Sequence, residues 1–314
     1  MYFFSEEERR YLLRGLIPRA RRAEVAEELR GWNWHQPPLE PPYDVRLGVY
    51  EVAAGYCPTA RDVYLRRVAR AKPRPFGAVQ AGAFFHAVLS RVVIEAKRLL
   101  YSSSDGCYRE AFSRLSQGGA EVVGALWPRF TEGIRPEEAA VLRDRALALW
   151  DFEASRLAAR VFDVLSRYAH LNVDALVSLA IPVVVEQKLN GSFIGLSSQL
   201  SVDAALTAEP IILDVKFGEP EEFHRLGTTG YALAWEAVYE VPINVGCIVY
   251  AEFRDGRWLL RRDFHLIDDE LRQWFVEERD RKMRLVFEEL DPGVAETCPQ
   301  CFYNDVCGQP RPST

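Results

Sequence analysis

The sequence predicts an α/β fold in which a largely helical first half precedes a set of short strands. Two observations support this prediction. Apolar residues recur with a helical period of about 3.6 as far as residue 170, and after residue 175 the period changes to about two. The segments with the shorter period are rich in β-branched residues and are bounded by turn residues, as strands are. We therefore expect an α/β arrangement with helical additions.

The first half is expected to contain four helical regions. Pro136 opens the last of them at the position in the first turn that proline favours. A loop with four prolines follows the first, and a softer segment with Gly118 and Gly119 precedes the last. The expected helices cover residues 1–30, 57–71, 77–100 and 135–170, the loop covers 31–43, and the softer segment covers 101–134.

The second half is expected to alternate strands with two helices. Asp255-Gly256 is a two-residue hairpin signal between the last two strands. Asp291-Pro292-Gly293 ends the final helix. The expected strands are 181–189, 195–206, 211–217, 245–253 and 258–266, and the expected helices are 231–240 and 268–290.

Composition and charge exclude several classes of protein. The chain has 314 residues, 48% apolar and 27% charged, with a net charge of −6, so it is neither disordered nor broadly basic. Its main basic stretch, residues 61–98, has nine Lys and Arg against two acidic residues; it is either a solvated helix face or a nucleic-acid contact. Charged residues interrupt the first ten positions, and we find neither a signal peptide nor a membrane span. We expect a cytoplasmic protein with no membrane partner.

Residues 193–218 contain a hairpin that carries two carboxylates. If Thr207–Pro210 is its turn, Asp203 lies opposite Asp214, with Cβ atoms ~4.5–5.5 Å apart. Lys216 projects from the same face as Asp214. Two carboxylates and a lysine in an otherwise apolar strand pair favour a divalent metal site that activates water against a phosphodiester. The alternative is a structural ion pair between Lys216 and one aspartate.

His86 lies in an apolar helical stretch beside Phe84 and Phe85. Such a histidine is usually a satisfied core residue. It becomes a metal ligand if this helix packs over the hairpin.

Three closely spaced cysteines on an irregular tail indicate a metal or a cluster. Cys298, Cys301 and Cys307 form a C-x2-C-x5-C pattern, and a fourth thiolate is needed to complete the site. Cys57, Cys107 and Cys247 are the candidates, and we choose Cys57 because it precedes a proline and begins a helix. Local chemistry does not distinguish zinc from iron–sulfur. Such a site closes a very long loop, so its loss should destabilise the domain.

Together these segments resemble the RecB-like iron–sulfur nucleases of CRISPR adaptation, and in particular an archaeal variant associated with type I-A systems. The resemblance rests on GWNWHQPPLEPPYDVRLGVYEV, YCPTARDVYLRRV, GAFFHAVLS, LSVDAAL, ILDVKFG and GYALAWE. It implies a RecB/restriction-endonuclease-like core, a mixed sheet flanked by helices, with helical N-terminal additions and a cysteine-rich tail that binds a cluster and packs back on the N-terminal segment.

The resemblance also implies roles for single residues. The metal ligands are His86, Asp203, Asp214 and the Val215 carbonyl, with Lys216 and Tyr231 completing the catalytic group around Mg²⁺ or Mn²⁺. A [4Fe–4S] cluster is held by four thiolates. Apart from the resemblance, the position of the basic helix just after Cys57 leads us to expect that four of its arginines contact a single-stranded backbone. The cluster cysteines are Cys57, Cys298, Cys301 and Cys307, and the DNA-contacting arginines are Arg61, Arg66, Arg67 and Arg70.

Two positions depart from the family pattern. The usual Glu-x-Lys of the third motif is Asp214-Val215-Lys216, and the glutamine one turn before the tyrosine is Gly227. The expected function is a metal-dependent DNA exonuclease on single strands or ends, acting in spacer acquisition with integrase subunits. The rivals are a catalytically weak scaffold that binds DNA ends and a zinc-stabilised binding module. We expect four parts: 1–100 with the first cluster cysteine and His86, 101–174 as a helical insertion, 175–290 as the nuclease core, and 291–314 as the tail.

Overall fold

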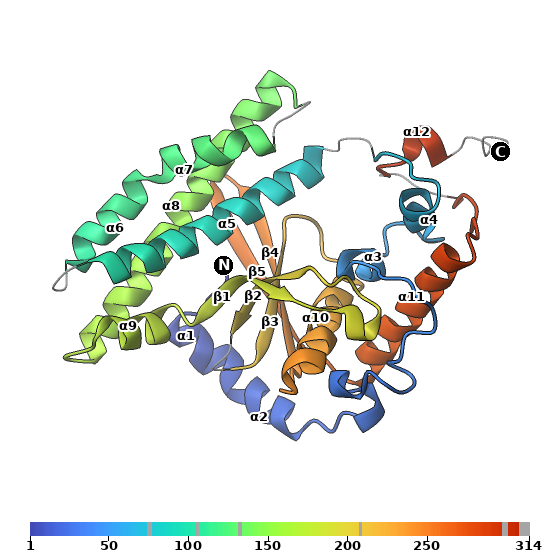
Figure 1. Cartoon of the computed structure of the whole chain (residues 1–314). Coiled ribbons are helices and arrows are strands. Elements are labelled where there is room, and N and C mark those ends of the chain that lie inside the picture. Colours follow the sequence, from blue (N-terminus) through green and yellow to red (C-terminus); the bar gives the residue numbers. More distant parts are fainter. Residues whose placement is uncertain (74–76, 104–106, 131–133, 207–208, 297–300, 308–314) are drawn as a thin grey trace.

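A five-stranded mixed sheet forms the centre of the protein in the computed structural model (Figure 1). The structure describes residues 1–314 except 74–76, 104–106, 131–133, 207–208, 297–300 and 308–314. The strands lie in the sheet in chain order: β1 (Val183–Leu189), β2 (Leu200–Leu206), β3 (Ile211–Lys216), β4 (Val245–Arg254) and β5 (Arg257–Leu266). All neighbours are antiparallel except β3 and β4, which are parallel and joined by the crossover helix α10 (His224–Tyr239).

Helices cover both faces of the sheet (Figure 1). On one face the long helices α5 (Gly77–Ser102) and α8 (Pro136–Arg167) pack over the strands and enclose one apolar core. On the other face α10, α11 (Asp269–Phe287) and the short α3 (Val49–Ala53) enclose a second core. The predicted α/β architecture with helical additions is confirmed.

The segment expected to be soft contains regular structure. Within residues 101–134, α6 (Tyr108–Gln117) and α7 (Gly119–Leu126) pack against α5 and α8, and the indole of Trp150 donates a hydrogen bond to the Leu115 carbonyl at 2.7 Å. A β-carbon at Gly119 would lie 2.6 Å from the Trp150 ring, so this glycine permits close packing and does not mark a loop. The prediction of a soft segment was wrong because its glycines were taken as signs of a loop. A further helix, α9 (Val173–Ala180), was also not expected.

Other predicted elements differ mainly at their ends. The predicted first helix is divided into α1 (Glu6–Glu8), a π-helical turn at Arg9–Leu13 and α2 (Arg14–Arg22). The helix expected over residues 57–71 is only α4 (Arg61–Arg67). The predicted Asp255-Gly256 hairpin is confirmed: Arg254 pairs with Arg257, and both turn residues have positive φ, as a type I′ turn requires.

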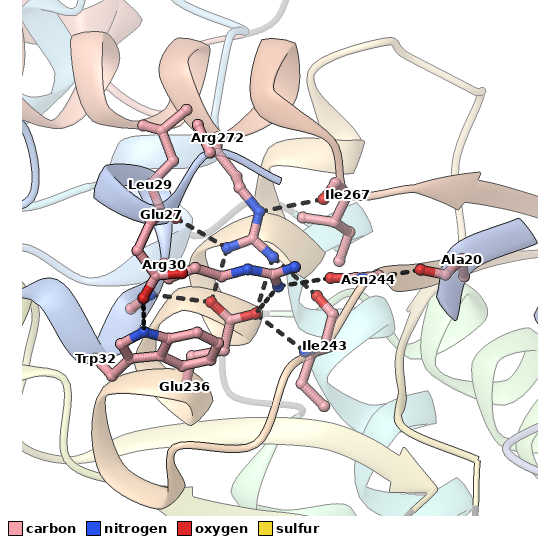
Figure 2. A network of polar contacts seen from close by, with 12 residues as sticks. Ala20, Glu27, Leu29, Arg30, Trp32, Glu236, Ile243, Asn244, Ile267 and Arg272 are labelled. Carbon is pink, nitrogen blue, oxygen red and sulfur yellow. Dashed lines mark hydrogen bonds and ion pairs between the residues drawn. The ribbon is translucent and has the colours of Figure 1, made fainter. Parts of the chain in front are cut away.

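The N-terminal segment is fastened to the core by a buried ion network, shown in Figure 2. Glu236 of α10 accepts hydrogen bonds from Arg272 of α11 at 2.7 and 2.9 Å and from Arg30 at 2.9 Å. Arg30 also donates to the Asn244 side chain at 2.7 Å, and Asn244 donates to the Ala20 carbonyl at 2.8 Å. Two buried cations share one carboxylate, so the network depends on every partner remaining in place.

One described helix, α5, is long and apolar enough to cross a bilayer by length and composition alone. Its apolar side chains form much of the core between the sheet and helices α5 and α8. Phe84, Val88, Leu89 and Val92 are among them, and each is fully buried. Helix α5 is therefore packed as a core helix of an α/β domain.

The tail packs against the N-terminal segment. Its short helix α12 (Asn304–Cys307) lies beside α4 in Figure 1, and Tyr303 and Cys307 form a small apolar cluster with Tyr64 and Leu65. The predicted contact between these distant segments is present. The four-part division of the chain stays a prediction.

Candidate active site

Asp203 and Asp214 face each other across neighbouring strands, as predicted. The pairing Ala204 with Leu213 and Ala205 with Ile212 sets the register, which continues to Asp203 opposite Asp214. The β2–β3 ladder stops one pair before the aspartates. Instead, the Asp203 carboxylate accepts a hydrogen bond from the Val215 backbone N–H at 3.3 Å. Both carboxylates therefore lie just beyond the end of the β2–β3 pairing.

Lys216 lies on the same side of β3 as Asp214, also as predicted. Its Nζ is 2.8 Å from the Asp214 Oδ2. Burial by itself lowers the pKa of this lysine, but the charges of Asp214 and Asp203 outweigh it and the pKa is raised. Lys216 is therefore held as a cation against the carboxylate pair, where it can stabilise negative charge that develops on a phosphate.

Asp203 is an unusual carboxylate in this setting. Burial raises its pKa to about 6, and the charge of Asp214 adds to the rise, while His86, Lys216 and the Val215 N–H oppose it. Two like charges in a poorly solvated place favour a cation between them. This donor set of paired carboxylates is chemically suited to Mg²⁺ or Mn²⁺.

Helix α5 places His86 at the same carboxylates. Its Nδ1 is 3.3 Å from Asp203 Oδ2, and its ring stacks edge-on against Phe217 with centroids 5.3 Å apart. The helix that carries His86 does pack over the hairpin, so the histidine contacts the carboxylate pair and is not enclosed by apolar side chains alone.

Helix α10 brings Tyr231 and Gly227 close to the carboxylate pair. Burial raises the pKa of Tyr231, and the charges of Asp203 and Asp214 raise it further, so the phenol stays protonated and can donate a hydrogen bond. A β-carbon at Gly227 would lie 3.1 Å from Asp214 Oδ2. The position where the family pattern has a glutamine is therefore filled by the Asp214 carboxylate itself.

Two residues in this site were not found by reading the sequence. Tyr2 is buried, its hydroxyl is 3.3 Å from His86 Nδ1, and burial together with the charges of Asp203, Glu186 and Asp214 raises its pKa. Glu186 of β1 lies opposite Asp203 in register, yet the two do not pair, and Glu186 has a φ of 52°. Such backbone strain in a strand is a common mark of a functional position. Tyr2 gave no sequence signal because it follows no motif spacing.

Serines hold the Glu186 carboxylate beside the site. Ser90, one turn after His86 on α5, donates to Oε1 at 3.0 Å, and Ser201 donates to Oε2 at 2.8 Å. In the part of the chain that the structure describes, no three His, Cys, Asp or Glu side chains converge closely enough to enclose a metal ion. The two serines therefore fix the direction of the Glu186 carboxylate beside Asp203.

The described cysteines of the tail lie against α4, close in the chain to Cys57. Cys301 and Cys307 belong to one small apolar cluster with Tyr64 and Leu65 of α4, the helix that follows Cys57. Burial raises the pKa of the Cys307 thiol, Arg61 opposes this, and Cys301 and Cys57 add to the rise. Cys298 lies outside the described residues. Cys107 is exposed in the helical insertion and Cys247 is buried in β4. Cys57, rather than Cys107 or Cys247, therefore accompanies the tail cysteines, and the donor set suits a thiolate-bound metal.

The basic helix mostly holds the tail. Arg61 is buried, forms a bidentate pair with Asp291 at 2.8 and 2.9 Å, and contacts both the carbonyl and the sulfur of Cys307. Arg67 pairs with Glu51, and Arg66 donates to the hydroxyls of Tyr303 and Tyr50. Arg70 alone of the four predicted DNA contacts is exposed without a partner in the described structure. These inward contacts show why a run of arginines is a weak predictor of a binding face.

Comparison with known proteins identifies relatives along almost the whole chain. A family model described as CRISPR-associated exonuclease Csa1 matches residues 1–310. The chain is similar to the CRISPR-associated exonuclease Csa1 of Saccharolobus solfataricus, with 31% identity over 286 residues, 90% of this chain and 92% of the relative. It is also similar to that of Thermoproteus tenax, with 33% identity over 286 residues, 91% of this chain and 92% of the relative. No solved structure matches the chain significantly.

Proposed function

This chain belongs to the CRISPR-associated exonuclease Csa1 family, and from that premise we propose that it is a metal-dependent DNA exonuclease acting on single strands or ends. One observation carries the proposal: Asp203 and Asp214 face each other on neighbouring strands beyond the end of their pairing, with Lys216 at 2.8 Å from Asp214. Tyr231, His86 and Glu186 surround this pair.

The residues that would hold Mg²⁺ or Mn²⁺ are Asp203, Asp214, His86 and the Val215 carbonyl, with Glu186 across the next strand. The bound metal would supply Lewis-acid polarisation of the phosphodiester and a water of lowered pKa. Asp203 must be ionised to act as a ligand, so its pKa of about 6 favours metal binding above that pH. Lys216 stabilises charge on the phosphate oxygens, and the protonated Tyr231 donates a hydrogen bond toward them.

We propose that Cys57, Cys298, Cys301 and Cys307 hold a [4Fe–4S] cluster with a mainly structural role. The proximity of Cys57, Cys301 and Cys307 and the bidentate Arg61–Asp291 pair beside them support it. The protein would act in the cytoplasm, in spacer acquisition, together with integrase subunits. Iron and zinc content after anaerobic purification tests the cluster: stoichiometric zinc without iron would overturn it.

The decisive experiment is cleavage of end-labelled single-stranded DNA with Mn²⁺. Wild type and Asp214→Ala are purified anaerobically and matched for iron content and circular dichroism. We expect the wild type to shorten the DNA and the variant to lose this activity, because its carboxylate pair is broken. If neither protein cuts the DNA, the exonuclease assignment is overturned.

A second candidate is a catalytically weak subunit that binds DNA ends. Gly227, at the position of the family's glutamine, favours it because the site lacks one polar side chain. In that case both proteins bind the DNA with equal affinity and neither shortens it.

A further inference from the structure

The first helical segment presents a face of exposed arginines, three of which have no partner in the described structure. No Asp or Glu occurs between residues 9 and 22, while five arginines in this stretch are exposed: Arg10, Arg14, Arg19, Arg21 and Arg22. Arg10 is 3.9 Å from Glu6, and Arg22 donates to the Pro18 carbonyl at 3.2 Å. The other three have no partner in the described structure. We name these five residues and Tyr11 the N-terminal arginine face.

An aromatic ring lies among these cations. Tyr11 is 79% exposed, and it lines a surface hollow together with Arg10 and Arg14. Guanidinium groups that track phosphates, with an exposed ring on which a base can stack, are the elements by which proteins bind single-stranded nucleic acid without sequence preference. The pairing of Tyr11 with its flanking arginines therefore fits a polynucleotide better than a simple counter-ion.

The opposite side of the same helix is already used. Leu13 and Ala20 are buried, and Leu16 and Ile17 pack against the core between the sheet and helices α5 and α8. A helix that lies on a membrane inserts its apolar side into the lipid. Because that side is occupied here, only the polar side is open to a partner, which favours a polyanion over a bilayer.

A second hollow nearby is lined by arginines that are already paired. It is formed by Arg9, Arg160 and Arg167 together with Glu6 and Tyr168. Arg160 pairs with Asp163 at 2.8 Å and with Glu6 at 3.5 Å, Arg167 pairs with Asp163, and Arg9 pairs with Glu209. Because these cations are neutralised by carboxylates, the hollow is not counted in the N-terminal arginine face.

Both ends of the segment are fixed relative to the active site. Arg9 pairs with Glu209 beside the β2–β3 turn at 2.6 Å, and Asn244 holds the Ala20 carbonyl (Figure 2). Tyr2, at the start of the segment, contacts His86. Arg10 lies eight positions after Tyr2, so chain length limits their separation to at most ~29 Å. A strand of several nucleotides bridges such a distance.

We propose that the N-terminal arginine face binds the backbone of single-stranded DNA whose end occupies the Asp203–Asp214 site. The inference rests on the proposed function for the location of the end, but binding to this face does not require cleavage. It also moves the main DNA contact away from the basic helix at Arg61–Arg67, three of whose arginines face inward.

The test measures the binding of fluorescein-labelled dT20 and dT4 by fluorescence anisotropy. The buffer contains EDTA so that no cleavage occurs. The variant is Arg10→Glu/Arg14→Glu/Arg21→Glu. We expect at least tenfold weaker binding of dT20 at low salt, and a slope of log affinity against log salt that is smaller by about 2, because each lost phosphate contact removes ~0.7. Binding of dT4 should weaken less than that of dT20, because a strand of four nucleotides makes fewer phosphate contacts with the face.

The matched control is Arg143→Glu/Arg254→Glu/Arg257→Glu, which makes the same change of charge at exposed arginines elsewhere. Tyr11→Ala gives an independent measure, with binding of dT20 weakened about fivefold through lost stacking. Equal loss in the control, or full dT20 affinity in the face variant, overturns the proposal. The proposal is also overturned if the wild type sediments with anionic vesicles while the face variant binds dT20 as tightly as the wild type does. The face would then bind a membrane and not DNA. The two proposals can fail separately. If none of the proteins cleaves DNA in the Mn²⁺ assay but only the face variant loses affinity for dT20, the proposed binding face is supported and the exonuclease assignment is overturned.

Discussion

The Asp203 carboxylate accepts the backbone N–H of Val215 at 3.3 Å, so the strand that carries Asp214 and Lys216 also positions the opposing aspartate. The bond forms where the β2–β3 ladder has ended and where β1 leaves Asp203 unpaired as well. Regular pairing is absent at this point, and a charged side chain takes the place of a backbone partner. Such an arrangement makes Asp203 costly for the metal-free fold.

The first prediction concerns the stability of Asp203→Asn. The folded pKa of about 6 exceeds the ordinary value of 3.8, so the native state binds more protons than the unfolded state between those values. Stability of the wild type therefore falls as pH rises from about 4 to 6, and the full penalty persists above that. In EDTA, Asp203→Asn should be more stable than wild type by on the order of 2 kcal/mol at pH 7.5 and nearly equal at pH 4. Urea unfolding at both pH values measures this, and a variant no more stable at pH 7.5 contradicts it.

The second prediction concerns Gly227→Ala. The new β-carbon would lie 3.1 Å from Asp214 Oδ2 and would displace the carboxylate. Single-turnover cleavage should fall roughly tenfold to a hundredfold, as small misplacements of a reacting group do. Stability should not fall, because alanine favours the helix over glycine. Gly218→Ala is the control, since nothing lies within 4 Å of its β-carbon. Equal activity in both variants would show that the Asp214 carboxylate does not need the space that the missing side chain of Gly227 leaves.

The third prediction separates two arginines that the sequence places in one group. Arg61→Ala breaks a buried pair with Asp291 and frees the Cys307 carbonyl. It should cost about 3 kcal/mol of unfolding free energy and reduce bound iron. Arg70→Ala removes an exposed, unpartnered cation, so stability should stay within about 0.5 kcal/mol. Urea unfolding and iron analysis measure both. Similar stability in the two variants would show that Arg61 does not hold the tail.

Sequence predicted the parts of the site that depend on local periodicity. The opposition of Asp203 and Asp214 follows from strand alternation and one turn, and the Lys216 contact follows from the same alternation. Tyr2 was not predictable, because it reaches His86 from a segment 84 positions away with no spacing rule. Glu186 was hidden because its φ of 52° breaks the strand regularity on which alternation relies. The inward direction of Arg61 depends on Asp291, whose position only the tertiary fold sets.

The last prediction concerns the buried network of Figure 2 and its link to the arginine face. Glu236 is fully buried and accepts from Arg272, Arg30 and the backbone N–H groups of Gly31 and Ile243. Glu236→Gln leaves two buried guanidinium groups without a counter-charge, which should cost about 3–5 kcal/mol. Glu252→Gln, at an exposed position of β4, should have little effect on stability.

Loss of this charge should also loosen the anchor of the arginine face. Arg30 orients Asn244, and Asn244 holds the Ala20 carbonyl at the end of α2. Hydrogen exchange over residues 14–33 should therefore accelerate in Glu236→Gln before the central strands open, because local opening requires less than the global free energy. Binding of dT20 should weaken in parallel. Asp214 and Lys216 should keep their positions, because they lie on β3, which the network does not contact. If exchange accelerates uniformly over the whole sheet, the network supports the fold as one unit and does not specifically hold the arginine face in place.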